Sequence, residues 1–127
     1  MEIVGLGTQI VECLKVRRLI DKHAELFLEQ VYTSRELLFC RDRKMSTEHY
    51  AAVWAAKEAV FRSLGTTWRK GTSWRDIELV CSNPIEPVVI VSGPTKQMQL
   101  ARGVIDFKLS MAHSRLYATA TAISLRN

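Results

Sequence analysis

The sequence predicts an α+β fold in which a small mixed sheet packs against one long central helix. The stretch 47–64 has helical character and is apolar on nearly every side, so it should be buried at the centre of the molecule. The segments 105–113 and 116–125 alternate in polarity as paired strands do. Strands and helices follow one another in a mixed order that ends in this hairpin, and such an order is typical of α+β proteins.

The first part of the chain predicts one strand and three helices. Residues 2–7 are short and β-branched, as in a buried strand. Apolar residues then recur at helical spacing over 10–23, and a second helical stretch covers 24–31. A shorter helix should begin at Thr33 or Ser34, since either side chain can serve as its N-cap.

The second part of the chain predicts the remaining elements in the same way. The long helix should end at Gly65, because glycine is favoured just beyond a helix C-terminus. Strands are expected at 76–81 and 88–91 and a helix at 94–102, and the final hairpin should turn near Ser114. No repeat or Pro/Gly-rich linker interrupts this order, so residues 1–127 should form one domain.

Composition indicates a soluble globular chain rather than a membrane or secreted one. Hydrophobic residues make up 47% and charged residues 24%, and no apolar run approaches the roughly 20 residues of a membrane span. The first residues lack the basic and apolar regions of a secretory signal. Cys13, Cys40 and Cys81 are odd in number and form no CxxC pattern, which predicts free thiols in a reducing compartment. We therefore expect a cytoplasmic protein.

The net charge of +5 predicts an anionic partner without identifying it. Nucleic acid, an acidic protein and a phosphorylated small molecule all qualify. A nucleic-acid-binding chain should carry a dense basic patch, exposed stacking aromatics or a known binding motif, and none of these is evident. Steeply salt-dependent binding to duplex DNA would be needed to revive that interpretation.

Charged residues in the middle of the long apolar helix are the strongest local anomaly. Lys57 lies on the apolar face, where a charge is costly unless it is paired or bound to a ligand. Glu58 and Arg62 are one turn apart, so they could form a surface ion pair on a thin solvated face. They could equally line a cleft in which Glu58 holds a cation while Lys57 and Arg62 meet phosphate. Periodicity leaves both interpretations open.

Four segments resemble a known family. Residues 54–60 read WAAKEAV, which resembles the helix signature of the holo-acyl-carrier-protein synthases, a group of 4′-phosphopantetheinyl transferases. Residues 5–12 (GLGTQIVE) resemble the family's N-terminal strand-turn-helix, and 73–79 (SWRDIEL) its central strand entry. Residues 110–120 resemble its C-terminal hairpin. The segments occur in family order, and the length suits the small bacterial type.

This resemblance implies a fold, an assembly and a reaction. The fold would be the α+β fold of these transferases, commonly assembled as a homotrimer with active sites between subunits. The partners would be coenzyme A and an apo-acyl-carrier protein, whose serine hydroxyl attacks the β-phosphate of coenzyme A. Phosphopantetheine is then esterified to the serine and 3′,5′-ADP leaves, with Mg²⁺ bridging the pyrophosphate.

The resemblance also implies roles for residues of the long helix. Glu58 stands where the family has a metal-binding carboxylate, and it, or a water that it orients, is the candidate general base. Lys57 and Arg62 stand at basic positions lining the coenzyme A phosphates, and Lys57 is counted with Glu58 as catalytic. Gly65 lies where the backbone passes close to the pantetheine chain.

Further roles fall on the hairpin and on the first helix. His113 and the adjoining Ser114 stand where the family's hairpin approaches coenzyme A, although strand parity alone would make His113 a core residue. Lys15, Arg18 and Lys22 form one basic stripe. A solvated helix face explains such a stripe, but the family docks acidic carrier proteins on this helix.

The sequence departs from the family pattern near the expected metal. Gln9 stands where the family has an Asp that ligates Mg²⁺; an amide oxygen can ligate a hard cation but brings no charge. Val53 stands where an Arg is usual near the coenzyme A phosphates, and Phe61 replaces a small polar residue. Two functions therefore remain open: an active transferase with a modified metal site, or a diverged paralogue that binds carrier protein or coenzyme A without transfer.

Overall fold

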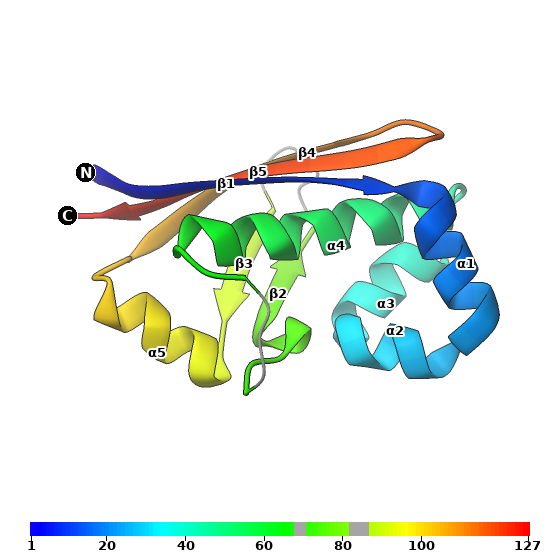
Figure 1. Cartoon of the computed structure of the whole chain (residues 1–127), viewed down its shortest axis with the longest axis horizontal. Coiled ribbons are helices and arrows are strands. Elements are labelled where there is room, and N and C mark those ends of the chain that lie inside the picture. Colours follow the sequence, from blue (N-terminus) through cyan, green and yellow to red (C-terminus); the bar gives the residue numbers. More distant parts are fainter. Residues whose placement is uncertain (68–70, 82–86) are drawn as a thin grey trace.

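The long helix lies between a sheet and a layer of shorter elements (Figure 1). The structure is a computed structural model that describes residues 1–67, 71–81 and 87–127. Helix α4 (Ser46–Ser63) runs along one face of a three-stranded antiparallel sheet of order β1-β5-β4. The strands are β1 (Glu2–Glu12), β4 (Asp106–His113) and β5 (Tyr117–Arg126).

Two groups of elements cover the other side of α4. At its N-terminal end lie α1 (Cys13–His23), α2 (Glu25–Val31) and α3 (Ser34–Arg41). The other group begins with the 3₁₀ turn η1 (Trp74–Asp76), which leads into the antiparallel pair β2 (Ile77–Val80) and β3 (Val88–Val91). Helix α5 (Gly93–Ala101) follows that pair. Enclosed in this way, α4 supplies more buried hydrophobic residues than any other described element.

Small residues let the sheet approach α4 closely. A Cβ on Gly7 would lie 2.0 Å from the carbonyl oxygen of Ala59, and one on Gly5 would lie 2.1 Å from that of Ser63. Every second residue of β5 on the same face is small and buried: Ala118, Ala120, Ala122 and Ser124. Because this packing leaves no room for larger side chains, it fixes the height of β1 over α4.

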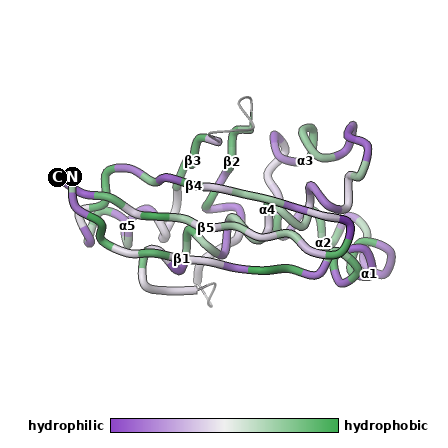
Figure 2. The backbone as a smooth tube through the Cα atoms, turned by 90° about the horizontal axis from the view of Figure 1, so that it is seen from above, coloured by the Kyte–Doolittle hydropathy of each residue, from purple (hydrophilic) through white to green (hydrophobic). Residues whose placement is uncertain are grey.

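The opposite face of the three-stranded sheet is uncovered, and Figure 2 looks down on it. Leu6 pairs with Ile123, and Ile10 with Thr119, on this outer face. Leu6 and Ile10 are 64% and 60% exposed. A face of this kind is half apolar and has no partner among the described parts of the chain.

The α+β class and the long central helix are confirmed. Two details differ from expectation: every strand pairing in the described segments is antiparallel rather than mixed, and the helix predicted from residue 10 begins at Cys13. The reason for the second is that β1 stays paired with β5 as far as Glu12 and Tyr117.

The described residues contain neither a disulfide nor a helix that could span a membrane. The three cysteines are unpaired, as the sequence predicts, and all three are buried. No described helix is long and apolar enough to cross a membrane.

Candidate active site

A cavity of about 700 Å³ opens between the end of β1, helix α1 and the middle of α4. Several residues predicted from the sequence line it: Gln9, Lys15, Arg18, Lys22 and Glu58. Its other walls are largely apolar, with Trp54 and Trp74 among them. The fold therefore brings the metal-site candidates and the basic stripe into one place, although they come from separate elements.

Glu58 lines this cavity, and one of its carboxylate oxygens has no hydrogen-bond donor among the described residues. The residue is only 6% exposed. Its Oε1 accepts hydrogen bonds from Arg62 Nε at 3.1 Å and from the hydroxyl of Thr67, whereas its Oε2 accepts none from any residue in the described segments. One turn of helix separates Glu58 from Arg62, which explains their pairing. Two donors thus hold Oε1, and none from the described residues holds Oε2.

Gln9 lies across from Glu58 with its amide oxygen already engaged. It is half-buried on the α4 side of β1, two residues after Gly7, and lines the same cavity. Its Oε1 accepts a hydrogen bond from the backbone N–H of Ile10 at 3.1 Å. The atom that would ligate a cation therefore has one of its two lone pairs engaged by the backbone.

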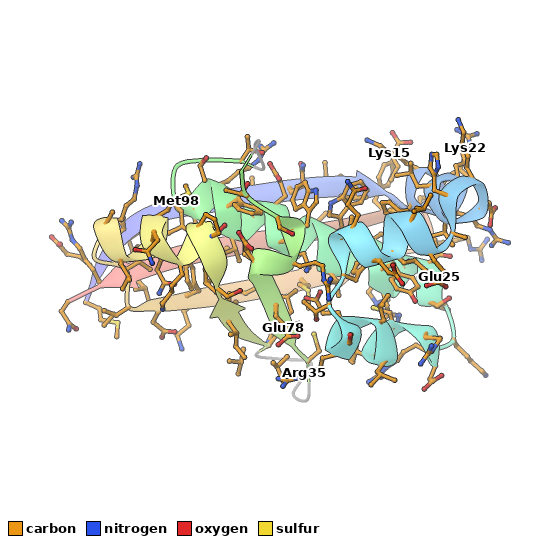
Figure 3. All side chains as sticks on the ribbon, turned by 90° about the horizontal axis from the view of Figure 1, so that it is seen from below. Lys15, Lys22, Glu25, Arg35, Glu78 and Met98 are labelled. Carbon is orange, nitrogen blue, oxygen red and sulfur yellow. The ribbon has the colours of Figure 1, made fainter. Side chains whose placement is uncertain are left out.

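The basic stripe gives the cavity a positive rim. Lys15, Arg18 and Lys22 are exposed on one side of α1, and Figure 3 shows Lys15 and Lys22 projecting together. Lys15 Nζ lies 6.0 Å from the ring centroid of Trp54, within reach of a cation–π interaction. Three bases face two carboxylates in the lining, Glu12 and Glu58, so the cavity favours an anionic partner.

A second, shallow and open cavity of about 520 Å³ adjoins the first where α4 ends. Arg62, Gly65, Thr66 and Thr67 line it, and Thr67 lines both cavities. Gly65 has φ +80°, a conformation that glycine adopts without strain. Arg62 and Gly65, both predicted to bind coenzyme A, thus lie near Glu58, where the two cavities meet.

Lys57 is not in either cavity, and its predicted role at phosphate is corrected. Its side chain is fully buried and lines neither cavity. Its Nζ lies 2.6 Å from Glu36 Oε1. It also donates to three backbone carbonyls: Val31 at 2.8 Å, Trp74 at 3.1 Å and Ile77 at 2.7 Å. These oxygens occupy all three N–H groups of the ammonium, so none remains for a ligand.

Burial dominates the electrostatics of this pair. Desolvation lowers the pKa of Lys57, and the nearby carboxylate of Glu36 opposes that effect. Desolvation likewise raises the pKa of Glu36, against the attraction of Lys57. Glu36 also accepts from the backbone N–H groups of Thr33 and Leu79. Its position in a T-x-x-E capping box is visible in the sequence, but its pairing with Lys57 is not.

His113 and Ser114 lie at the far end of α4. The His113 ring lies 4.8 Å from that of His49, and its Nδ1 is 3.7 Å from Glu48 Oε2. Ser114 bonds locally with Tyr117 in the hairpin turn. Glu48 precedes Glu58 by ten residues, or about 15 Å of helix. Within one chain, the hairpin residues and Glu58 do not converge.

Two departures from the family pattern belong to the core. Val53 is 1% exposed and Phe61 is fully buried. Neither side chain lines either cavity. Val53 therefore offers no replacement for the positive charge of the Arg that is usual at this position. Thr67 is the site residue that sequence reasoning missed, because a threonine in a loop carries no periodic or motif signal.

Comparisons with known proteins agree with this geometry. A family model described as "4'-phosphopantetheinyl transferase superfamily" matches residues 5–122. Among relatives, a holo-[acyl-carrier-protein] synthase of Rhodopirellula baltica is 35% identical over 123 residues, 97% of this chain and 98% of that protein. One of Caldanaerobacter subterraneus is 36% identical over 125 residues, 98% of this chain and 96% of that protein.

Solved structures show the same similarity. The holo-[acyl-carrier-protein] synthase of Neisseria meningitidis has a TM-score of 0.87 at 26% identity and covers 98% of this chain and 100% of its own. The synthase of Bacillus anthracis, solved in complex with CoA (3',5'-ADP), has a TM-score of 0.79 at 30% identity and covers 98% of each chain.

The substitution Lys57→Met should destabilise the fold by about 3–5 kcal/mol, because it leaves the carboxylate of Glu36 buried without its partner. Urea unfolding followed by circular dichroism measures this. The double variant with Glu36→Leu should recover part of the loss, since no unpaired charge remains. A Lys57→Met variant with wild-type stability would contradict a structural role for the pair.

Proposed function

The chain belongs to the 4′-phosphopantetheinyl transferase superfamily, and we propose that its cavity beside Glu58 is where phosphopantetheine passes from coenzyme A to a carrier protein. As a full-length relative of the holo-acyl-carrier-protein synthases, the protein esterifies a serine of apo-acyl-carrier protein and releases 3′,5′-ADP. The observation that carries the site assignment is the Oε2 of Glu58, which accepts no hydrogen bond from the described residues, in a cavity that the basic stripe of α1 also lines.

Two neighbouring hollows suit two substrates. An acidic carrier protein docked on Lys15, Arg18 and Lys22 would bring its serine to the cavity of Glu58, because these bases line that cavity. The cavity at Arg62 and Gly65 would receive coenzyme A, and the guanidinium of Arg62 offers N–H donors besides the Nε that binds Glu58. The two substrates would then meet at Glu58.

The reaction follows from that meeting. The serine oxygen bonds to the β-phosphorus of coenzyme A, and the bond from that phosphorus to the oxygen shared with the 5′-phosphate breaks. The serine proton passes to Glu58 directly where Oε2 holds no ion, or to a water that Glu58 orients where Oε2 is a metal ligand. 3′,5′-ADP leaves with the bridging oxygen.

The donor set fits Mg²⁺ only in part. Within the described segments, no group of three or more His, Cys, Asp or Glu side chains is placed to hold a metal ion. Glu58 Oε2 can serve as one hard oxygen ligand, whereas the oxygen of Gln9 is hydrogen-bonded to Ile10. We expect Glu58 to hold the ion together with phosphate oxygens. When bound, Mg²⁺ neutralises the charge that develops on the pyrophosphate.

We also propose a homotrimer with sites between subunits. The exposed outer face of the sheet, with Leu6 and Ile10, is apolar surface that an interface would cover. His113 lies about 15 Å of helix away from Glu58 in its own chain. Both hairpin residues, His113 and Ser114, could contact coenzyme A bound at a neighbour's Glu58. Assembly would then complete each active site with residues of a second subunit.

A binding module without transfer is the second candidate. The engaged oxygen of Gln9 and the buried, uncharged Val53 favour it, because both weaken the expected hold on metal and phosphate. Such a module would form a complex with acidic carrier protein, bind coenzyme A weakly and give no product.

Incubation with coenzyme A, Mg²⁺ and apo-acyl-carrier protein should add phosphopantetheine to the carrier, detected by intact-protein mass spectrometry. Glu58→Ala should lower the rate by roughly 10²- to 10⁴-fold, since it removes the candidate base. The matched control is Glu29→Ala, which removes an exposed carboxylate outside both cavities. Transfer at the wild-type rate by Glu58→Ala contradicts the assigned role.

The substitution Gln9→Asp should tighten Mn²⁺ binding roughly tenfold, because it adds a second carboxylate facing Glu58. Electron paramagnetic resonance of free Mn²⁺ measures this without catalysis, and Gln30→Asp on the surface of α2 is the control. Equal affinity in both variants places position 9 outside the metal site. If transfer is absent in the native chain and appears only with Gln9→Asp, the native protein is the binding module.

The substitution Leu6→Lys should dissociate the assembly, because it places a charge on the outer face of the sheet. Light scattering coupled to size exclusion should give three times the 14.5 kDa chain mass for the native protein and a smaller mass for the variant. Leu100→Lys, on an exposed residue of α5, should leave the mass unchanged. A native mass of one chain rules out the trimer.

A further inference from the structure

We infer that Thr67 is a positioning residue for the transfer reaction, which with Arg62 holds one oxygen of Glu58 so that the other faces the substrate. This inference rests on the proposed function of Glu58. Thr67 belongs to none of the sequence motifs of the chain, and it lines both cavities. Its hydroxyl donates to Glu58 Oε1.

The end of α4 is built to deliver this hydroxyl. The N–H of Gly65 bonds to the carbonyl of Arg62, and the N–H of Thr66 bonds back to Phe61. The left-handed conformation of Gly65 reverses the chain at this point. Thr67 therefore returns over the helix turn that carries Glu58, nine residues earlier in the sequence.

Two donors on a single oxygen leave the carboxylate little freedom. Arg62 Nε approaches Oε1 from the next helix turn and Thr67 from the returning loop. Hydrogen bonds to a charged acceptor are the strong ones, and Glu58 is 6% exposed, so little water competes for its oxygens. Oε2 is then presented to the cavity in one orientation. A base must lie within hydrogen-bonding reach of the proton that it takes.

Thr67 adds to Arg62 a donor of a different kind. Both residues are exposed, Arg62 with 48% of its side chain, so exposure does not distinguish the two donors. Arg62 also faces the second cavity, where a bound phosphate would compete for its guanidinium. Because Thr67 is neutral, a phosphate does not draw it away electrostatically.

The residues of this site make hydrogen bonds from the chain necessary to orient the carboxylate of Glu58. Two carboxylates around one metal ion would orient each other through that ion, but Gln9 brings no charge and its oxygen is bonded to Ile10. The orientation of Glu58 then depends on hydrogen bonds from the chain itself. Thr67 and Arg62 supply them.

The central test is Thr67→Val, which keeps the shape of the side chain and removes the donor. We expect kcat to fall about 10- to 100-fold, the loss of one hydrogen bond to a charged group. The KM values for coenzyme A and carrier protein should stay within about twofold, because binding does not use this bond. Thr67→Ser should restore most of the rate. Thr47→Val, in the first turn of α4 and outside both cavities, is the matched control.

A double-mutant comparison shows whether Thr67 acts through Glu58. In a Glu58→Gln background, Thr67→Val should cause no further loss, since the oxygen that it positions is no longer a base. An equal loss in both backgrounds, a raised KM with unchanged kcat, or a wild-type kcat for Thr67→Val overturns the inference. Wild-type protein that transfers nothing refutes the proposed function instead.

A spectroscopic readout does not depend on turnover. In protein labelled with ¹³C at glutamate side chains, the carboxyl resonance that disappears in Glu58→Gln belongs to Glu58. That resonance should move in Thr67→Val and stay in place in Thr47→Val. If Thr67→Val leaves it unmoved, the hydrogen bond is absent and the inference is refuted.

Discussion

The ion pair between Lys57 and Glu36 is the interaction on which the arrangement of the site depends. The ammonium also binds carbonyls of Val31 and Ile77, and Glu36 binds the N–H of Leu79. One buried charge pair thereby ties α4 to the end of α2, the start of α3 and strand β2. Breaking one partner is costly in a dry interior, whereas the intact pair with satisfied hydrogen bonds is tolerated. The helix that carries Glu58 is held in register by its neighbouring residue.

Lys57 and Glu58 are adjacent in the sequence, but their side chains lie in different environments. Successive helical residues are rotated by about 100°, so the two side chains leave α4 in different directions. Lys57 enters the core and Glu58 enters the cavity beside Gln9. The signature that they share therefore places one charged side chain in the core and the other at the wall of the cavity.

Close packing of the sheet sets the opposite wall of the site. Gly7 allows β1 to lie against the backbone of α4, and Gln9, two residues on, then reaches the level of Glu58. The same sheet turns exposed Leu6 and Ile10 outward. A single strand thus contributes Gln9 to the cavity and leaves Leu6 exposed on its other face, as the two-residue period of β-structure requires.

Sequence by itself determined the α+β class, the long helix and most element boundaries, because amphipathic spacing, capping residues and glycine positions are local signals. It also indicated Glu58 and Gln9 and the basic stripe of α1, which the fold brings into one cavity. Tertiary structure decided what local patterns cannot encode. It gave Lys57 a partner 21 residues away in Glu36, extended β1 through pairing with β5, and returned Thr67 onto Glu58. These contacts join segments distant in sequence, and their geometry exists only once the chain has packed.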